Sequence, residues 1–298
     1  MQTLRSTTVA ALAALALSAS CGESSASGPG QVLRFTAIPD ANTTELTAKY
    51  AALADYLAGE LGIEVQYVPT IDYQASVEAF KNGDVQLAWF GGLTGAQARE
   101  AVAGARAIAQ GKVDPVYKSY FIANAASGLS PSEEFPMDLE GKKFCFGSES
   151  STSGRLMPEY FIREHTGKAP GEFFAEIHFS GDHDKTASLV ADGTYDAGAL
   201  SYKKYDELVA DGKLDAAQCF VIWTTPEYAD YNWTAHPGLD TTLGAGFVER
   251  VQEALVGMKD PACLKALMRE EGLIAASNQD FESLRELAAE LGFLRASK

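Results

Sequence analysis

Short apolar segments alternate with amphipathic segments along most of this 298-residue chain. Residues 33–38, 64–68 and 85–90 have the composition of buried strands, and residues 43–61 and 72–81 repeat apolar side chains at helical spacing. Strands separated by helices form βαβ units, which place the strands in a mostly parallel sheet with helices on both faces. The sequence therefore predicts an α/β fold.

The same alternation starts again after a polar loop at residues 125–136. A chain of this length exceeds what one hydrophobic core usually fills, so we expect two lobes of roughly 100 to 150 residues each. The predicted strands after the loop are residues 143–147, 176–180, 195–200 and 219–224.

The N-terminal residues have the pattern of an export signal followed by a tether. Residues 1–20 carry one positive charge, at Arg5, and an apolar run at 9–17 that is too short to span a bilayer. Cys21 follows directly, and residues 22–30 are polar and rich in Gly and Ser. A cysteine at this point is typical of a bacterial lipoprotein whose thiol carries a lipid anchor. The alternative is a secreted protein with an incidental cysteine. Both place the mature chain outside the cytoplasm.

Acidic side chains outnumber basic ones, with 40 Asp and Glu against 24 Lys and Arg and a formal net charge of −16. Nucleic acids and anionic membrane surfaces attract proteins that carry positive patches. The charge balance therefore excludes nucleic acid as a partner and argues against direct binding to an anionic membrane surface.

Three cysteines lie beyond the N-terminal region: Cys145, Cys219 and Cys263. They form no CxxC pair and no Cys/His zinc spacing. In an oxidising compartment Cys219 and Cys263 could pair while Cys145 stays buried on a strand. A soft metal held by the three thiols is the other alternative, and the sequence leaves the choice open.

Small hydroxyl residues fill one turn between a predicted strand and a predicted helix. Ser151, Thr152 and Ser153 lie in this turn, with Gly147 and Gly154 at its ends. A helix N-terminus presents unpaired N–H groups and a partial positive charge, so these hydroxyls and amides form a cradle for a tetrahedral oxyanion. The turn has no Gly-Lys-Ser/Thr sequence and is not a nucleotide-binding P-loop. A plain N-cap cluster is the alternative interpretation.

Three further turns follow predicted strands in the same way. His183 starts a helix, where its ring could donate a hydrogen bond to an anion or serve only as a cap or surface residue. Phe90 ends another strand, and Gly91 and Gly92 after it permit close backbone approach to a ligand. Tyr73 begins the helix after a third strand. Ligands in open α/β sheets bind beyond the carboxyl ends of the strands, where all these turns fall.

Catalytic patterns are weak in this chain. It has no Gly-x-Ser-x-Gly sequence, and none of its four histidines has an evident nucleophilic partner. We therefore predict no catalytic residue, no metal site and no cofactor.

Four stretches of sequence carry a resemblance to a known family: residues 72–80, 83–91, 151–158 and 179–183. Together they resemble the phosphate/phosphite/phosphonate-binding lipoproteins of bacterial ABC transporters, which have the type II periplasmic binding protein fold. The resemblance covers essentially the mature chain. It implies two α/β lobes, joined by two hinge strands, that close on a small oxyanion.

The resemblance also implies an organisation and a set of partners. Residues 31–121 and 226–298 would form lobe 1 and residues 122–225 lobe 2. The protein would act as a monomer, with its ligand and an ABC transporter permease as partners and the membrane reached through the lipid on Cys21. The same fold also serves as the sensing subunit of two-component systems and, less often, as an enzyme of thiamine-pyrimidine synthesis.

By the same resemblance, a set of site residues would hold the ligand. Asp230, on the segment that returns to lobe 1, would be the carboxylate that faces the ligand's protonated oxygen. A phosphoryl group keeps a proton near neutral pH, whereas sulfate or selenate has none and is repelled by a carboxylate. Residues 42–45 and 89–95 are nevertheless similar to a branch described as selenate-binding, so the anion stays open. The implied ligand-binding residues are Tyr73, Phe90, Gly91, Ser151, Thr152, Ser153, His183 and Asp230.

Overall fold

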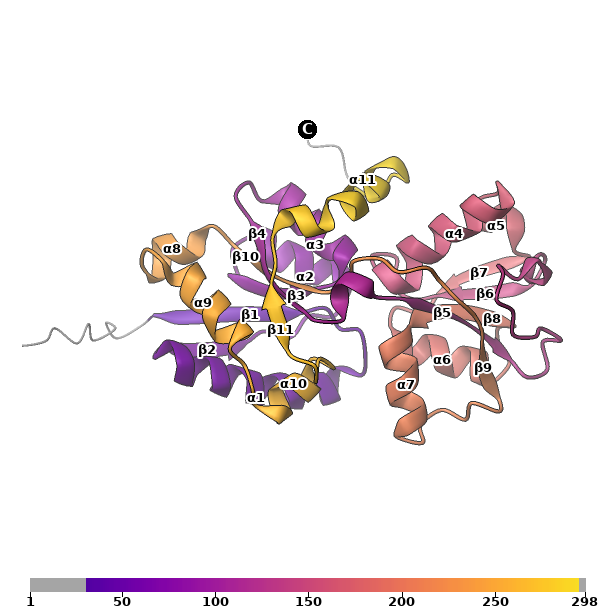
Figure 1. Ribbon diagram of the computed structural model, residues 1–298, viewed down its shortest axis with the longest axis horizontal. Coiled ribbons are helices and arrows are strands. Elements are labelled where there is room, and N and C mark those ends of the chain that lie inside the picture. The colour runs from indigo at the N-terminus through magenta and orange to yellow at the C-terminus, as the bar shows by residue number, and fades with distance from the viewer. Residues whose placement is uncertain (1–30, 295–298) are drawn as a thin grey trace, which may run out of the picture.

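Two β-sheets, each flanked by helices, form two lobes that lie side by side (Figure 1). The computed structural model describes residues 31–294. The predicted signal peptide at 1–20 and the tether at 21–30, with Cys21, lie outside the described residues.

The first sheet has six strands in the order β11-β4-β10-β3-β1-β2. Helices α1, α9 and α10 pack together on it, and α2, α3 and α11 form a second group. The strands are β1 (Val32–Ala37), β2 (Glu64–Tyr67), β3 (Leu87–Phe90), β4 (Arg106–Gly111), β10 (Asn232–Ala235) and β11 (Leu273–Ala275). The helices are α1 (Thr43–Leu61), α2 (Tyr73–Lys81), α3 (Gly92–Ala101), α8 (Gly238–Leu243), α9 (Phe247–Val256), α10 (Pro261–Ala266), η4 (Asn278–Phe281) and α11 (Glu282–Glu290).

The second sheet has five strands in the order β7-β6-β8-β5-β9. Helices α4 and α5 lie on one side of it and α6 and α7 on the other (Figure 1). The strands are β5 (Ser119–Asn124), β6 (Lys143–Phe146), β7 (Glu176–Phe179), β8 (Ala197–Ser201) and β9 (Cys219–Thr224). The helices are η2 (Met137–Leu139), η3 (Thr152–Leu156), α4 (Met157–Thr166), α5 (Pro170–Phe173), α6 (His183–Ala191) and α7 (Tyr202–Ala210).

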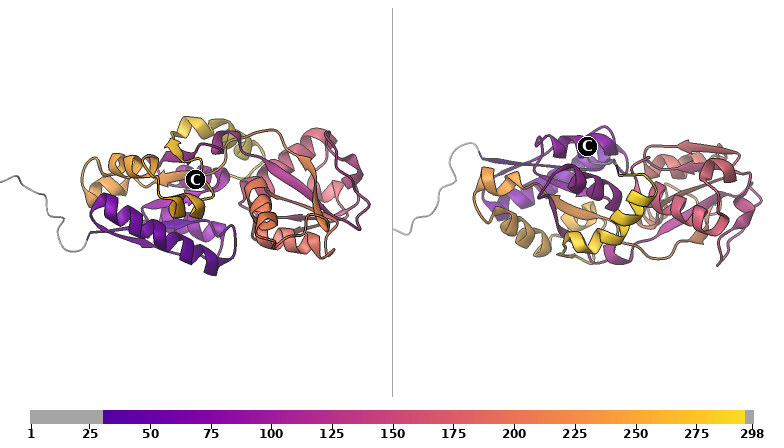
Figure 2. Two further views of the ribbon diagram at one scale, coloured as in Figure 1. Left: turned by 60° about the horizontal axis from the view of Figure 1, so that its bottom comes forward. Right: turned by 90° about the horizontal axis from the view of Figure 1, so that it is seen from above.

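Two segments of chain cross between the lobes, which stay distinct in both views of Figure 2. Residues 112–118 connect β4 to β5 and contain the short helix η1 (Asp114–Val116), and residues 225–231 connect β9 to β10. The crossings run side by side, because Tyr117 and Tyr228 form an antiparallel bridge.

Each sheet is mixed, but four strands of each run in the same direction, as expected of a mostly parallel sheet. β1, β2 and β3 run parallel, as do β6, β7 and β8. The strand delivered by each crossing is antiparallel to both of its neighbours: β5 lies between β8 and β9, and β10 between β3 and β4. Such a strand enters its sheet from the interface, toward which its two neighbours run. The predicted lobe boundary after Phe121 falls inside β5, whose residues all pair in the second sheet.

A buried ion pair lies beneath the crossings. Arg269 donates to the Asp114 carboxylate from Nη2 at 2.6 Å and from Nε at 2.8 Å, and neither side chain is more than 1% exposed. The guanidinium also lies over the rings of Trp89, Tyr117 and Tyr231. These contacts join the first crossing to the C-terminal part of the first lobe.

The three cysteines in the described range are free and buried. Cys145 lies on β6, as predicted, but Cys219 is on β9 of the second lobe and Cys263 is in α10 of the first. The disulfide alternative is therefore wrong. Within residues 31–294, no group of three or more His, Cys, Asp or Glu side chains could hold a metal ion, which argues against the thiol-metal alternative. Over the same residues, every helix is too short or too polar to cross a membrane.

Candidate functional site

Four helical segments begin where the two lobes face each other. α2 and α3 belong to the first lobe, and η3 and α6 to the second. Asp72 caps α2 by accepting a backbone N–H at 2.7 Å, and Asp182 caps α6 in the same way at 2.8 Å. Because an N-cap fixes where a helix starts, these two bonds place Tyr73 and His183 as the first residues of their helices.

The hydroxyl turn forms a buried start to η3. Ser151 accepts the Gly154 amide at 2.9 Å, so it is an N-cap, as the alternative interpretation held. A Cβ on Gly154 would lie 3.0 Å from Ser151 Oγ and 3.1 Å from the Gly147 Cα, so a side chain there would force the turn to shift. Ser151, Thr152 and Ser153 are all 2% exposed or less. These three side chains are therefore shielded from bulk solvent.

η3 has π-helical geometry, which the sequence does not predict. The Leu156 amide bonds to the Ser151 carbonyl at 3.0 Å, five residues back. Turns of this kind are rare and occur often at functional sites. Pro158 follows as the second residue of α4, directly after the π-helical turn.

His183 has a buried ring without a partner. Its backbone amide donates to the Asp40 carbonyl of the first lobe at 3.2 Å, and its side chain is 1% exposed. Among residues 31–294, neither ring nitrogen has a hydrogen-bond partner. Burial, with a smaller contribution from Lys204, lowers the pKa of His183 to about 4 although Asp40 and Asp182 oppose the shift. The imidazole is therefore neutral near pH 7, with one N–H to donate.

Tyr73 also has an unpaired polar atom. Its side chain is 1% exposed, and its hydroxyl has no hydrogen-bond partner in the part of the chain that the structure describes. Burial raises the pKa of Tyr73 well above its usual value, Asp40 and Asp230 add to the shift, and the neighbouring Ser151 side chain opposes it. The hydroxyl is therefore a protonated donor close to the hydroxyl turn and to Asp230.

Asp230 links the second crossing to the start of α3. Its Oδ1 accepts the Gly92 amide at 2.8 Å, and its Oδ2 is buried without a hydrogen-bond partner among the described residues. Burial raises the pKa of Asp230 to about 7, against the opposing effects of the Gly92 amide and the Thr152 side chain. A Cβ on Gly91 would lie 3.2 Å from Thr152 Oγ1 and 3.3 Å from Asp230 Oδ1, so glycine permits this approach.

The two lobes touch directly at this point. Thr152 Oγ1 in the second lobe accepts the Leu93 amide of α3 at 3.0 Å. Ser153 uses its carbonyl to accept the Ser119 hydroxyl at 2.8 Å. Phe90 is fully buried and packs edge-on against Phe80, with ring centroids 5.6 Å apart. The sequence predicts Phe90 as a ligand-binding residue. In the structure its ring packs in the core, and Gly91 follows it in the chain.

Two residues near the site were missed from the sequence. Asp40 is 3% exposed, and its Oδ2 accepts the Tyr231 hydroxyl at 2.8 Å. Asp40 lies in the loop just after β1, so the rule that ligands bind beyond strand ends would have found it. Tyr231 has no such signal, because only the second crossing brings it here.

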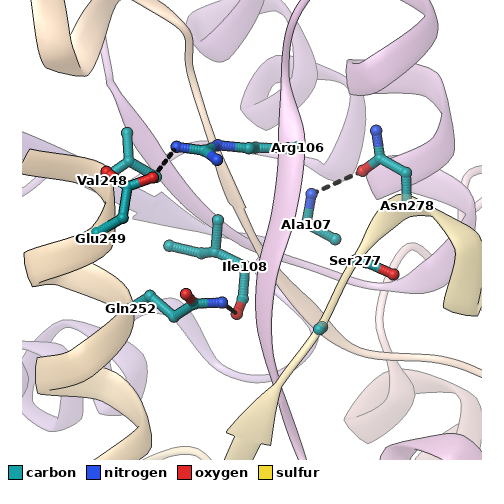
Figure 3. Close-up of a pocket in the computed structure, with 9 residues that line it drawn as sticks. Arg106, Ala107, Ile108, Val248, Glu249, Gln252, Ser277 and Asn278 are labelled. Atoms are coloured by element: carbon teal, nitrogen blue, oxygen red, sulfur yellow. Dashed lines mark hydrogen bonds and ion pairs between the residues drawn. The ribbon is translucent and has the colours of Figure 1, made fainter. Parts of the chain in front are cut away.

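A surface pocket elsewhere on the first lobe is a poorer candidate. It lies between β4, α9 and the segment after β11 (Figure 3). Its polar side chains are already paired: Arg106 with Glu249 at 2.7 Å, Gln252 with a backbone carbonyl at 2.6 Å, and Asn278 with a backbone amide at 2.8 Å. None of the predicted site residues lines it.

Comparison with known proteins identifies the family. Residues 35–281 match the family described as the periplasmic substrate-binding protein of phosphonate ABC transporters. The chain belongs to this family. It is an extracytoplasmic substrate-binding protein of an ABC transporter. Its relatives are transport proteins, which supports neither the enzyme nor the sensing alternative.

Individual relatives match over most of their length. A probable phosphite-binding protein of an ABC transporter from Prochlorococcus marinus is 34% identical over 278 residues, 89% of this chain and 91% of the relative. Its structure in complex with methylphosphonate has a TM-score of 0.82 and covers 87% of this chain and 98% of that one. A phosphate-import protein from Mycolicibacterium smegmatis is 32% identical over 255 residues, 78% of this chain and 76% of the relative.

Proposed function

We propose that the site binds a small tetrahedral phosphorus oxyanion that shares one proton with Asp230. Phosphonate, phosphite and phosphate belong to this class. The observation that carries the proposal is a set of buried polar atoms without partners: Tyr73 Oη, His183 Nδ1 and Nε2, and Asp230 Oδ2. Leaving such groups unpaired costs about 1 to 3 kcal/mol each, so a ligand that satisfies them gains affinity.

The donors and the acceptor fit an oxyanion. Ser151 and Thr152 each accept a backbone amide through the side-chain oxygen, which leaves the hydroxyl hydrogen for the ligand. Tyr73 and neutral His183 add one donor each. Asp230 Oδ2 is the one unpaired carboxylate oxygen of the set and takes the proton of a singly protonated ligand. Neutral donors at short range bind an anion despite the net charge of −16.

The names of the relatives support a phosphorus ligand. They include a phosphite-binding protein, a phosphate-import protein and a structure with methylphosphonate bound. Selenate, the other anion expected from the sequence, carries no proton and is repelled by the ionised Asp230 carboxylate. We therefore expect selenate to bind more weakly than the phosphorus anions.

Ligand binding would favour the closed arrangement. Tyr73 and Asp230 come from the first lobe and its crossing, and Ser151 and His183 from the second. A ligand that contacts both adds affinity for the closed form only, so it shifts the equilibrium about the crossings at 112–118 and 225–231. The closed, loaded monomer would then dock on its permease, tethered to the membrane through lipid on Cys21.

A thermal-shift panel tests the ligand class. Phosphate, phosphite, methylphosphonate, sulfate and selenate are each added to the purified protein. A ligand that binds only the folded form raises the melting temperature. We expect shifts with the phosphorus anions at pH 8 and none with sulfate or selenate. Shifts confined to sulfate and selenate would reject the proposal.

A further inference from the structure

Arg155 is packed beside the hydroxyl turn. It lies on η3, and its side chain is 15% exposed. The guanidinium carbon is 4.7 Å from the centroid of the Phe146 ring and 4.8 Å from that of Phe179. Phe146 ends β6 and Phe179 ends β7. β6 leads into the hydroxyl turn, and β7 leads into the turn that contains His183. Arg155 therefore packs against the ends of the two strands that carry these turns.

A third ring reaches Arg155 from the other lobe. Phe293, which follows α11, has its ring centroid 5.5 Å from the guanidinium carbon. Its amide donates to the Ala288 carbonyl at 2.7 Å, and its carbonyl accepts Gln97 Nε2 of α3 at 3.1 Å. Figure 1 shows α11 on the first lobe, running toward the second. Phe293 is therefore fixed to α3, the helix that begins at Gly92 beside the proposed ligand.

The polar contacts of Arg155 satisfy only part of its guanidinium group. The three aromatic rings are therefore important for holding the side chain in place. Its Nη2 pairs with Glu159 Oε2 at 2.5 Å, within the same lobe. Its Nη1 is buried and has no hydrogen-bond partner within residues 31–294. A cation shielded from water gains more from aromatic faces than an exposed one does.

We infer that Arg155 and Phe293 are positioning residues that hold the hydroxyl turn in its ligand-binding position while the lobes are closed. The inference rests on the proposed function. The contact spans the two lobes, so it stabilises the closed form and not the separate lobes. It therefore slows the opening that releases the ligand.

Stopped-flow tryptophan fluorescence with methylphosphonate tests the inference. Phe293→Ala should raise the dissociation rate about three- to tenfold and change the association rate by less than about twofold. Phe293→Tyr, which keeps the ring, should restore the slow rate. Ser283→Ala, at an exposed position of α11, is the matched control and should change neither rate.

A second variant separates positioning from folding. In an Arg155→Met background, Phe293→Ala should raise dissociation by less than about twofold, because its partner is gone. The melting temperature of ligand-free Phe293→Ala should equal that of the unmodified protein. An unchanged dissociation rate in Phe293→Ala, or additive effects of the two substitutions, would overturn the inference alone. Failure of the unmodified protein to bind methylphosphonate, phosphite or phosphate would overturn the proposed function and the inference with it.

Discussion

Asp230 accepts the backbone amide of Gly92 at 2.8 Å through one carboxylate oxygen and keeps the other buried and unpaired. One oxygen thus holds the start of α3, and in the proposed function the other is left for the ligand. The desolvation that raises the pKa of this group to about 7 outweighs the hydrogen bond. Asp230 therefore lowers the stability of the ligand-free protein at neutral pH, and in the proposed function the same group selects the anion.

Asp230→Asn is expected to stabilise the ligand-free protein at alkaline pH. A carboxyl whose pKa is raised on folding contributes stability that is present below its unfolded pKa of 3.8 and is lost as pH rises through about 7. The asparagine variant lacks this loss. From pH 4 to pH 8, the free energy of unfolding of the variant should therefore rise relative to that of the unmodified protein by up to about 4 kcal/mol.

Urea unfolding at several pH values measures this difference. The pKa of His183 is lowered to about 4, so its neutral form adds stability that is lost as pH falls through that value. Both proteins retain His183, and its effect cancels in the comparison. A difference between the two proteins that does not change with pH would contradict the account of Asp230.

Ser151→Ala and Thr152→Ala should each weaken phosphonate binding by about 1.5 to 3 kcal/mol, the range for a hydrogen bond to a charged group. Calorimetric titration measures the loss. Ser150→Ala removes a half-buried hydroxyl from the same turn and serves as the control, with affinity expected to stay within about twofold. Unchanged affinity in both site variants would show that the turn does not hold the anion.

Arg269→Met should destabilise the protein by about 3 to 5 kcal/mol, because it leaves the buried Asp114 carboxylate without its partner. Chemical denaturation measures the effect. The double variant Asp114→Asn/Arg269→Met removes the charge as well and should recover part of the loss. A single variant within about 1 kcal/mol of the unmodified protein would mean that the pair does not brace the crossing.

Lys213→Ala should leave ligand affinity within about twofold, although the Lys213–Glu45 pair at 3.0 Å joins the two lobes. Both side chains are about half exposed, so water and salt screen their attraction. Affinity measured at low and high salt checks this expectation. A tenfold loss at low salt would show that this surface pair controls closure.

The sequence predicts the parts of the fold that depend on local pattern. Asp72 and Asp182 cap the helices that follow β2 and β7, and the structure starts these helices at Tyr73 and His183, within a residue of the starts that the sequence indicates. β5 and β10 run antiparallel to their neighbours because the chain enters each of them from the other lobe. The alternation of strands and helices in the sequence does not encode this direction.

Part of the candidate site could be predicted because its residues follow strand ends. The rest could not be predicted because it depends on contacts between distant parts of the sequence. The hydroxyl turn and His183 follow strand ends, which is a local signal. Arg269 meets Asp114 across 155 positions of sequence, and Tyr231 reaches Asp40 across 191. Such contacts arise from tertiary packing and leave no periodic trace. Asp230 was expected only through the family resemblance.

Calorimetry at pH 8 with methylphosphonate and selenate, on the unmodified protein and on Asp230→Asn, tests the central claim most directly. The unmodified protein should bind methylphosphonate at least about tenfold more tightly than selenate, because its ionised carboxylate repels an anion without a proton. In Asp230→Asn the amide can donate to a fully ionised oxygen, so the ratio should fall or reverse. Equal affinities in the unmodified protein, or the same ratio in both proteins, would contradict the claim that Asp230 selects a protonated phosphorus oxyanion.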